Sequence, residues 1–149
     1  MKDTLGLIFA YQREELMKAL TQKRALSSIP FGGRYRIVDF ALSNMVNSGI
    51  TKVGVITRNT YQSLMDHLGS GKEWDLNRKN DGLYMLPPFN QSEGYRGKME
   101  ALLNANDFIR KSNCEYVVLA TADNICNMTF DDALEYHKAK EADITIIYK

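Results

Sequence analysis

Three polar segments that each follow a predicted strand carry the residues best suited to chemistry. One begins after Ala10 and includes Arg13, the second begins with Arg58 after Thr57, and the third contains Asp123. Ligands of open α/β sheets bind outside the carboxyl ends of the strands, so a site is expected at these segments. A carboxylate at the end of a strand, such as that of Asp123, suits a hard cation like Mg²⁺. The alternative is that Asp123 only caps or hydrogen-bonds the turn that follows it.

Apolar patterning predicts the strands and helices that position these segments. Short apolar runs rich in β-branched residues are typical of buried parallel strands, and apolar residues at helical spacing predict helices between them. The predicted strands are residues 4–10, 52–57, 116–120 and 142–148; the predicted helices are residues 60–68, 97–111 and 131–140, with a weaker helix or structured loop at 11–21. Thr129 is expected to cap the last helix. The alternation predicts an α/β domain with a mainly parallel sheet and right-handed crossovers.

Residues 29–50, IPFGGRYRIVDFALSNMVNSGI, are predicted to form a tight loop, a buried extended piece and a short capped helix. Gly32 and Gly33 can take positive φ angles or admit a second backbone, which a Cβ would prevent. Asp39 is expected to cap the helix through its side-chain oxygen. Gly49 lies where helices commonly end in the left-handed conformation.

Residues 69–96 are predicted to be a long irregular region, because glycines and prolines recur through it. Loops of this length inside a compact domain are usually functional or disordered. The aromatic residues Trp74, Tyr84, Phe89 and Tyr95 favour an ordered loop. Trp74 and Tyr84 would either stack on a ligand or tie the loop to the body of the protein or to a neighbouring subunit.

The composition and net charge of the chain argue against several classes of function. The chain has 149 residues, the size of one domain, with 19 Lys and Arg against 18 Asp and Glu, hence a net charge of 19 − 18 = +1. This balance argues against nucleic-acid or membrane-surface binding, which needs a clustered basic face. Cys114 and Cys126 match no metal or redox spacing, so free thiols and a cytoplasmic location are expected. No apolar run approaches the roughly 18 residues that span a membrane.

Five stretches, in order and with matching spacing, resemble the ADP-glucose pyrophosphorylases (glucose-1-phosphate adenylyltransferases). They are residues 29–50, GSGKEWDLNRKNDGLYMLPPF at 69–89, YRGKMEALLNANDFI at 95–109, EYVVLATADNICNM at 115–128 and ADITIIY at 142–148. The resemblance implies a Rossmann-like nucleotidyltransferase domain followed by a left-handed β-helix domain. Residues 1–149 would be the N-terminal part of the first domain, with the remainder of that domain and the β-helix domain outside the chain. The predicted strand that reaches the end of the chain also indicates the front part of a longer protein.

The resemblance places the family's triphosphate-binding loop directly after the first strand, and the chain departs from it there. The family pattern is G-G-x-G-x-R, whereas residues 11–16 read YQREEL, without a glycine and with Leu16 in place of the arginine. Glycines let backbone N–H groups point at phosphate, and an arginine neutralises its charge. Glu14 and Glu15 instead add negative charge, which repels a second charge at 4 Å by about 4 kcal/mol at an effective dielectric constant of 20. Arg13 is expected to be a solvated surface charge.

Other positions that the resemblance assigns to nucleotide binding have changed as well. Leu26 stands where the family has a phosphate-contacting lysine, and Arg58 stands where it has a nucleotide-holding glutamine. Met99 and Glu100 replace small residues that accept the nucleotide. Asp123 keeps the register of the family's Mg²⁺-binding aspartate, but the neighbouring His, Tyr and Lys of that motif have become Asn124, Cys126 and Asn127.

The resemblance therefore implies a degenerate site with no catalytic residue. The degenerate nucleotide-binding positions are Tyr11, Arg13, Leu16, Leu26 and Arg58, and the candidate metal ligand is Asp123. Mg²⁺ is the family's cofactor, and the sequence does not predict that it is retained here.

Three functions are compatible with this sequence. The first is a catalytically impaired regulatory subunit that pairs with a catalytic ADP-glucose pyrophosphorylase subunit in glycogen biosynthesis. The second is an active sugar-1-phosphate nucleotidyltransferase that makes ADP-glucose from ATP and glucose-1-phosphate. The third is a module without a partner that binds a sugar or a sugar-phosphate effector. The joint loss of the phosphate-handling positions favours the first.

Overall fold

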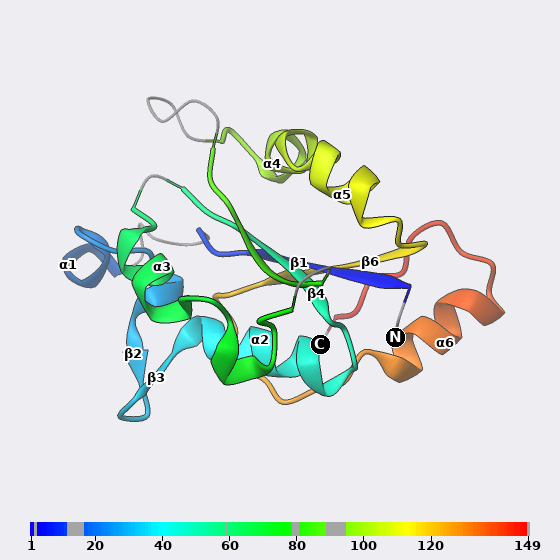
Figure 1. The fold of residues 1–149 in the computed structure, drawn as a ribbon, viewed down its shortest axis with the longest axis horizontal. Helices are drawn as coiled ribbons and strands as arrows, with labels where there is room; N and C mark the ends of the chain where they lie inside the picture. The colour runs from blue at the N-terminus through cyan, green and yellow to red at the C-terminus, as the bar shows by residue number, and fades with distance from the viewer. Residues whose placement is uncertain (2, 12–16, 59, 79–80, 89–94, 149) are drawn as a thin grey trace.

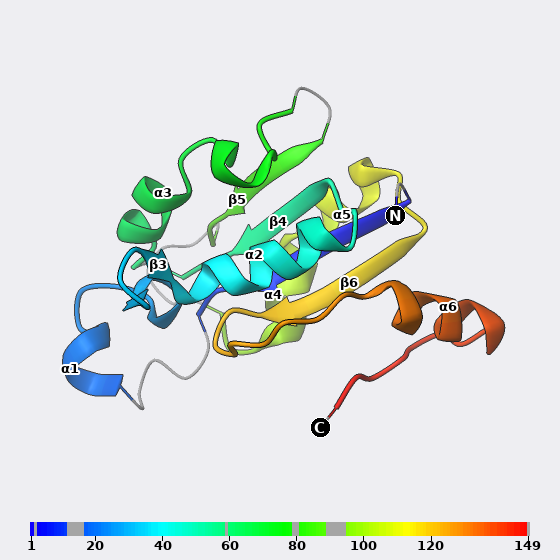
Figure 2. The same ribbon diagram turned by 90° about the horizontal axis from the view of Figure 1, so that it is seen from below.

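A four-stranded parallel sheet forms the centre of the computed structural model, which describes residues 1, 3–11, 17–58, 60–78, 81–88 and 95–148. Its strands are β1 (Thr4–Phe9), β4 (Lys52–Ile56), β5 (Gly82–Leu86) and β6 (Tyr116–Thr121), in the spatial order β5-β4-β1-β6 (Figures 1 and 2). Leu5 of β1 pairs with Lys52 of β4, and Thr4 pairs with Tyr116 of β6. This arrangement confirms the predicted α/β fold with a mainly parallel sheet.

Helices cover both faces of the sheet (Figures 1 and 2). One face carries α2 (Ile37–Asn47) and α3 (Gln62–Leu68), and the other carries α4 (Lys98–Asn104) and α5 (Asn106–Ser112). The larger core cluster joins β1 and β4 to α2 and α3 through side chains such as Ile8, Leu42 and Leu64. The smaller cluster joins the ends of β1 and β4 to α4 and α5. Two cores therefore fix the central strands from both sides.

Gly54 in β4 allows the second core to form. A Cβ on this residue would lie 2.8 Å from side-chain atoms of Leu7, Leu86 and Phe108, which is closer than van der Waals contact permits. Phe108 belongs to α5, so the missing side chain lets this helix approach the sheet.

The segment at residues 29–50 partly differs from its prediction. Pro30–Phe31 (β2) and Tyr35–Arg36 (β3) form a small antiparallel hairpin whose turn contains Gly32 (φ 62°) and Gly33 (φ 93°), as expected for a shaped loop. Gly49 has the predicted left-handed conformation (φ 70°). The buried extended piece is absent, since Tyr35 is exposed and α2 already begins at Ile37. Asp39 therefore lies in the first turn, where its Oδ2 accepts the Arg36 N–H at 2.9 Å.

Two predictions about the sheet were wrong. Residues 69–96 are not irregular throughout, because they contain a 3₁₀ turn, η3 (Lys72–Trp74), and β5, which pairs in parallel with β4. Residues 142–148 form no strand: Ile144 and Ile146 are 80% and 77% exposed, and no strand among the described residues pairs with this segment. β-branched residues favour a strand only where they pack against a partner.

The remaining helices also refine the prediction. Of the helix or structured loop predicted at 11–21, the described residues contain α1 (Lys18–Thr21), and residues 12–16 lie outside the described part. α6 spans Asp131–Ala139. The N-cap residue of α6 is Phe130 and makes no side-chain cap, so the expected Thr129 cap is not formed. The predicted helix at 97–111 is divided at Ala105, and Met99 and Leu103 are exposed rather than part of a buried stripe. β6 is only half-buried, because it lies at the edge of the sheet. Among the described residues, no helix is long and apolar enough to span a membrane.

Candidate functional site

The three polar segments begin at the same edge of the sheet, where the strands end. The Ala10 N–H donates to the Ile56 carbonyl at 2.9 Å, so the segment after β1 starts beside the end of β4. The Ala122 N–H donates to the Phe9 carbonyl at 3.0 Å, which places the segment after β6 on the other side of β1. This edge is where ligands of doubly wound sheets bind.

Tyr11, Arg58 and Tyr95 form a compact cluster at this edge, which we call the Tyr–Arg cluster. The guanidinium carbon of Arg58 lies 4.9 Å from the centroid of the Tyr11 ring, and Arg58 Nη2 donates to the Tyr95 carbonyl at 2.7 Å. The Tyr11 and Tyr95 ring centroids are 5.7 Å apart. Phe9 places its ring edge-to-face with Tyr11 at 6.0 Å. The cluster brings together two predicted site residues, Tyr11 and Arg58, from loops that follow neighbouring strands.

Burial sets the chemistry of the cluster. Tyr11 is 5% exposed and Tyr95 is 3% exposed. Burial raises the pKa of Tyr11 to about 12, although the positive charge of Arg58 acts in the opposite direction. Burial also raises the pKa of Tyr95, and the nearby Glu100 carboxylate adds to that effect. Both phenols stay protonated at neutral pH, so they can donate hydrogen bonds but cannot act as bases there.

Three polar atoms of this region are buried and have no hydrogen-bond partner among the described residues. They are the Tyr11 hydroxyl, Arg58 Nε and the hydroxyl of the neighbouring Thr57. Buried polar groups are normally hydrogen-bonded, and unpaired ones are common at functional positions. The side chains described at this edge therefore leave some of its buried donors and acceptors without hydrogen bonds.

Leu26 approaches the same edge from the opposite face of the sheet. It starts a 3₁₀ turn, η2 (Leu26–Ser28), that lies against α2 and α3, and its side chain is buried. The adjacent Ser27, also buried, donates its hydroxyl to the Ala10 carbonyl at 2.9 Å. Ser27 thus holds the backbone directly before Tyr11. The sequence contained no signal for this role, because Ser27 and Ala10 are 17 positions apart and no local pattern links them.

Asp123 is half-buried at the end of β6 and lies in a segment that α2 anchors. Asn44 donates its amide to the Cys126 carbonyl at 3.1 Å and accepts the Met128 N–H at 3.2 Å. Ser48 accepts the Phe130 N–H at 2.8 Å. Sequence reasoning missed both Asn44 of α2 and Ser48, the C-cap residue of that helix.

The residues around Asp123 do not assemble a metal site by themselves. In the part of the chain that the structure describes, no three His, Cys, Asp or Glu side chains gather closely enough to hold a metal ion. Mg²⁺ needs near-octahedral oxygen coordination, and Asp123 supplies one carboxylate toward it. The donor set therefore does not fit a protein-only magnesium site. Arg13 and Leu16, the other predicted positions, lie outside the described residues.

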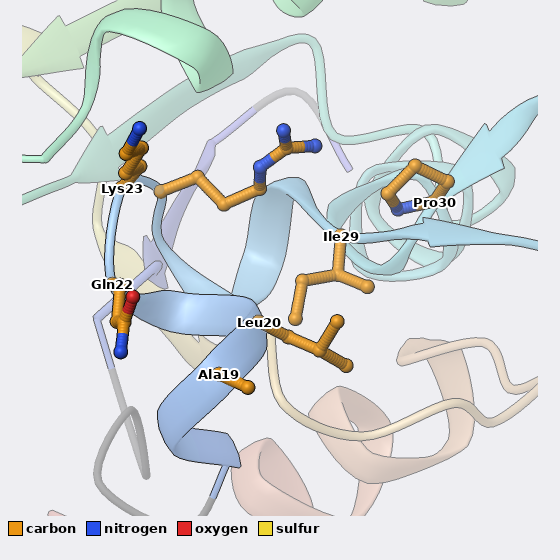
Figure 3. A pocket seen from close by; sticks show the side chains of 7 residues that line it. Ala19, Leu20, Gln22, Lys23, Ile29 and Pro30 are labelled. Carbon is orange, nitrogen blue, oxygen red and sulfur yellow. The ribbon is translucent and has the colours of Figure 1, made fainter.

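A separate pocket of about 360 Å³ lies beside α1 (Figure 3). Leu20 of α1 faces Ile29 across it, and Lys23 stands at its margin. Arg24 also lines the pocket, so two cations border a largely apolar floor. None of the residues of the Tyr–Arg cluster line it. This pocket was not predicted from the sequence.

A parallel sheet covered by helices on both faces, with its loops gathered at the carboxyl edge, defines a doubly wound α/β domain of the nucleotide-handling type. The chain belongs to the nucleotidyl transferase family, whose family model matches residues 15–149.

Individual relatives agree with the resemblance inferred from the sequence motifs. The chain is 40% identical over 148 residues to a glucose-1-phosphate adenylyltransferase of Clostridium kluyveri, a match that covers 97% of this chain and 39% of the relative. It is 43% identical over 146 residues to the glycogen biosynthesis protein GlgD of Geobacillus stearothermophilus, covering 96% of this chain and 43% of the relative. The chain thus spans about two fifths of the length of these curated relatives.

A solved structure supports the fold independently. A putative glucose-1-phosphate thymidylyltransferase from Bacillus anthracis, crystallised with sucrose, matches with a TM-score of 0.70. The match covers 93% of this chain and 51% of that one at 21% sequence identity. At this identity, the likeness supports the shared fold alone.

Proposed function

We propose that this chain is part of a catalytically impaired, regulatory subunit of glucose-1-phosphate adenylyltransferase, which serves ADP-glucose synthesis for glycogen. The observation that carries the proposal is the joint loss of phosphate-handling residues on a retained scaffold. The glycines of the triphosphate loop are absent, and Leu16 and Leu26 stand at its two cationic positions. The buried packing of Leu26 beneath the edge supports a structural role for that position.

The chemistry of the family explains why these losses matter. The phosphate oxygen of glucose-1-phosphate attacks the α-phosphorus of ATP, and pyrophosphate leaves. Such a reaction depends on positioning and on cationic groups that stabilise the developing charge. Removing one such group typically slows a reaction by a factor of about 10²–10³. With the glycine loop and two cations absent, little turnover is expected from this subunit alone.

The decisive experiment is an ADP-glucose synthesis assay with the full-length protein purified alone. No turnover above background is expected from ATP, glucose-1-phosphate and Mg²⁺. A catalytic adenylyltransferase assayed under the same conditions provides the positive control. Turnover close to that of the control would overturn the proposal and favour the alternative, an active sugar-1-phosphate nucleotidyltransferase.

A catalytic adenylyltransferase subunit is the proposed partner. Co-expression of the two full-length proteins should give a stable hetero-oligomer whose activity or effector response differs from that of the catalytic subunit alone. Co-purification followed by the same assay measures both properties. A lack of association would favour the third function, a binding module without a partner.

The pocket beside α1 gives the binding-module alternative a specific location. Lys23 and Arg24 are exposed at its margin and would attract a sugar-phosphate effector. Calorimetric titration of the full-length protein with glucose-1-phosphate tests this alternative. Substituting Lys23→Gln should weaken binding at this pocket, whereas Lys140→Gln, on the distant α6 end, should not.

A further inference from the structure

The ring of Tyr11 fills a position that has the properties of an aromatic-ligand site. Arg58 covers one side of the ring at 4.9 Å, Tyr95 lies 5.7 Å away, and Phe9 presents a ring at an interplanar angle of 82°. Cation–π contacts and edge-to-face or tilted aromatic contacts are also interactions by which proteins hold planar ligands such as nucleobases. The surroundings therefore suit a flat ring, and a side chain of the protein itself supplies that ring.

The position of Tyr11 makes this packing relevant to the edge of the sheet. Ala10, directly before it, is held on two sides: its N–H bonds to Ile56 and its carbonyl accepts the Ser27 hydroxyl. The backbone therefore places Tyr11 at the carboxyl edge of the sheet, where the segments that follow β1 and β4 meet. In doubly wound sheets, this edge is the usual location of the ligand.

The unpaired polar atoms indicate that a phenol ring is a poor match for this place. The Tyr11 hydroxyl, Arg58 Nε and the Thr57 hydroxyl are all buried, and within the described part of the chain none of them has a hydrogen-bond partner. Tyr11 and Thr57 are both more than nine-tenths buried. A heteroaromatic ring carries acceptors and donors on its edge and can pair with such groups, whereas the edge of a phenol ring offers only carbon-bound hydrogens apart from its hydroxyl.

We propose that Tyr11 occupies the place of a planar heteroaromatic ligand and thereby closes the carboxyl edge of the sheet to nucleotides. This inference rests on the proposed function of an impaired subunit and adds a second cause of impairment. The lost cations weaken phosphate binding, and the Tyr11 ring excludes the base. The two causes are separable, because a nucleoside has a base and no phosphate.

The test uses adenosine, which does not depend on the lost phosphate-binding positions. In the full-length protein, Tyr11→Gly removes the ring while leaving Arg58 and Tyr95, and calorimetry measures adenosine binding. Binding at least tenfold tighter than in the unsubstituted protein is expected. Tyr11→Phe keeps the ring and should bind no better than the unsubstituted protein.

Two further variants control for the place of binding. Tyr148→Gly removes a ring that is 90% exposed, and it should leave adenosine affinity unchanged. In the Tyr11→Gly background, Arg58→Ala should abolish the gained affinity, since Arg58 covers the ring position. Equal binding by the unsubstituted protein and Tyr11→Gly would overturn the proposal, as would a folded Tyr11→Gly variant that fails to bind.

Thermal unfolding keeps the test decisive if Tyr11→Gly is unstable. A ligand that binds only the folded state of a protein raises the Tm of that protein. Adenosine should therefore raise the Tm of the Tyr11→Gly variant and leave the Tm of the unsubstituted protein unchanged. No rise for the variant would overturn the proposal. The ADP-glucose assay distinguishes failure of this inference from failure of the proposed function. Turnover by the unsubstituted protein would contradict the proposed function. If the unsubstituted protein is inactive and Tyr11→Gly does not bind adenosine, only the occlusion by Tyr11 is contradicted.

Discussion

Gly54 and Tyr11 determine at the residue scale how α4 and α5 meet the sheet. Gly54 leaves room for Phe108 of α5, and Tyr11 packs against Tyr95, just before α4. Gly54 contributes space because it has no side chain, and Tyr11 contributes a large buried ring. Both effects belong to single positions and can be measured by single substitutions.

Gly54→Ala should lower the free energy of unfolding by about 1–3 kcal/mol, because overpacking a tight core forces neighbouring groups to move. The new methyl group would lie 2.8 Å from three side chains. Urea denaturation of the full-length protein measures the change. Gly97→Ala is the matched control, since no described atom lies within 4 Å of a Cβ built at that residue. Equal effects of the two substitutions would contradict the packing argument.

The buried Tyr11 phenol predicts a loss of stability in alkaline solution. Burial raises its pKa from 10.0 to about 12, so the unfolded chain releases this proton at lower pH than the folded protein does. The contribution is fully present below pH 10 and is lost as the pH rises toward about 12. The expected slope approaches about 1.4 kcal/mol per pH unit. Denaturation at several pH values compares the protein with Tyr11→Phe, which should lack this component; identical slopes would contradict it.

At the scale of elements, α2 links regions that are far apart in the sequence. Asn44 of α2 and Ser48, the C-cap residue of this helix, hold the segment that follows β6, more than 80 residues away. The same helix is capped through Asp39, whose Oδ1 also lies 2.7 Å from His67 Nε2 of α3. α2 is therefore the element that fixes the loop after β6 relative to the rest of the domain.

Asn44→Ala should destabilise the protein by about 1–3 kcal/mol, because it leaves the Met128 N–H and the Cys126 carbonyl without their partner. Asn47→Ala, on the same helix and exposed, should change the stability by less than about 0.5 kcal/mol. Chemical denaturation of the two variants provides the comparison. Similar values for both would show that the amide does not anchor this segment.

Local pattern explains which elements were predictable. β1, β4 and β6 are short apolar runs with clear boundaries, and the strand-and-helix alternation around them was sufficient for the fold class. β5 was missed because its five residues lie among glycines and prolines, and only its pairing with β4 makes it a strand. The hydrogen bonds of Ser27, Asn44 and Ser48 connect distant residues, and no local pattern encodes them. Tyr11 and Arg58 were named as site residues, but their direct contact required the three-dimensional fold.

At the scale of the whole molecule, the proposed function combines a retained scaffold with several lost phosphate-handling positions. Restoring one lost cation should therefore not restore the reaction. Leu26→Lys should leave ADP-glucose synthesis undetectable and lower the Tm, because it places a charge in a buried position beneath α2 and α3. Leu26→Met conserves volume and should have little effect on the Tm. Measurable synthesis by Leu26→Lys alone would show that this position, and not several together, limits activity.

The exposed segment at 142–148 has a consequence for handling the protein in solution. Ile144, Ile146 and Tyr148 present apolar surface, and the neighbouring Ile147 lines a cavity together with Leu119 and Thr121 of β6. β6 is a half-exposed edge strand whose outer side has no paired neighbour among the described residues. Unpaired edges with β-branched apolar residues are sites of aggregation. Residues 1–149 expressed alone should therefore form higher-order particles as concentration rises, which light scattering detects. Ile144→Lys with Ile146→Lys should suppress that self-association by adding charge to the aggregating segment.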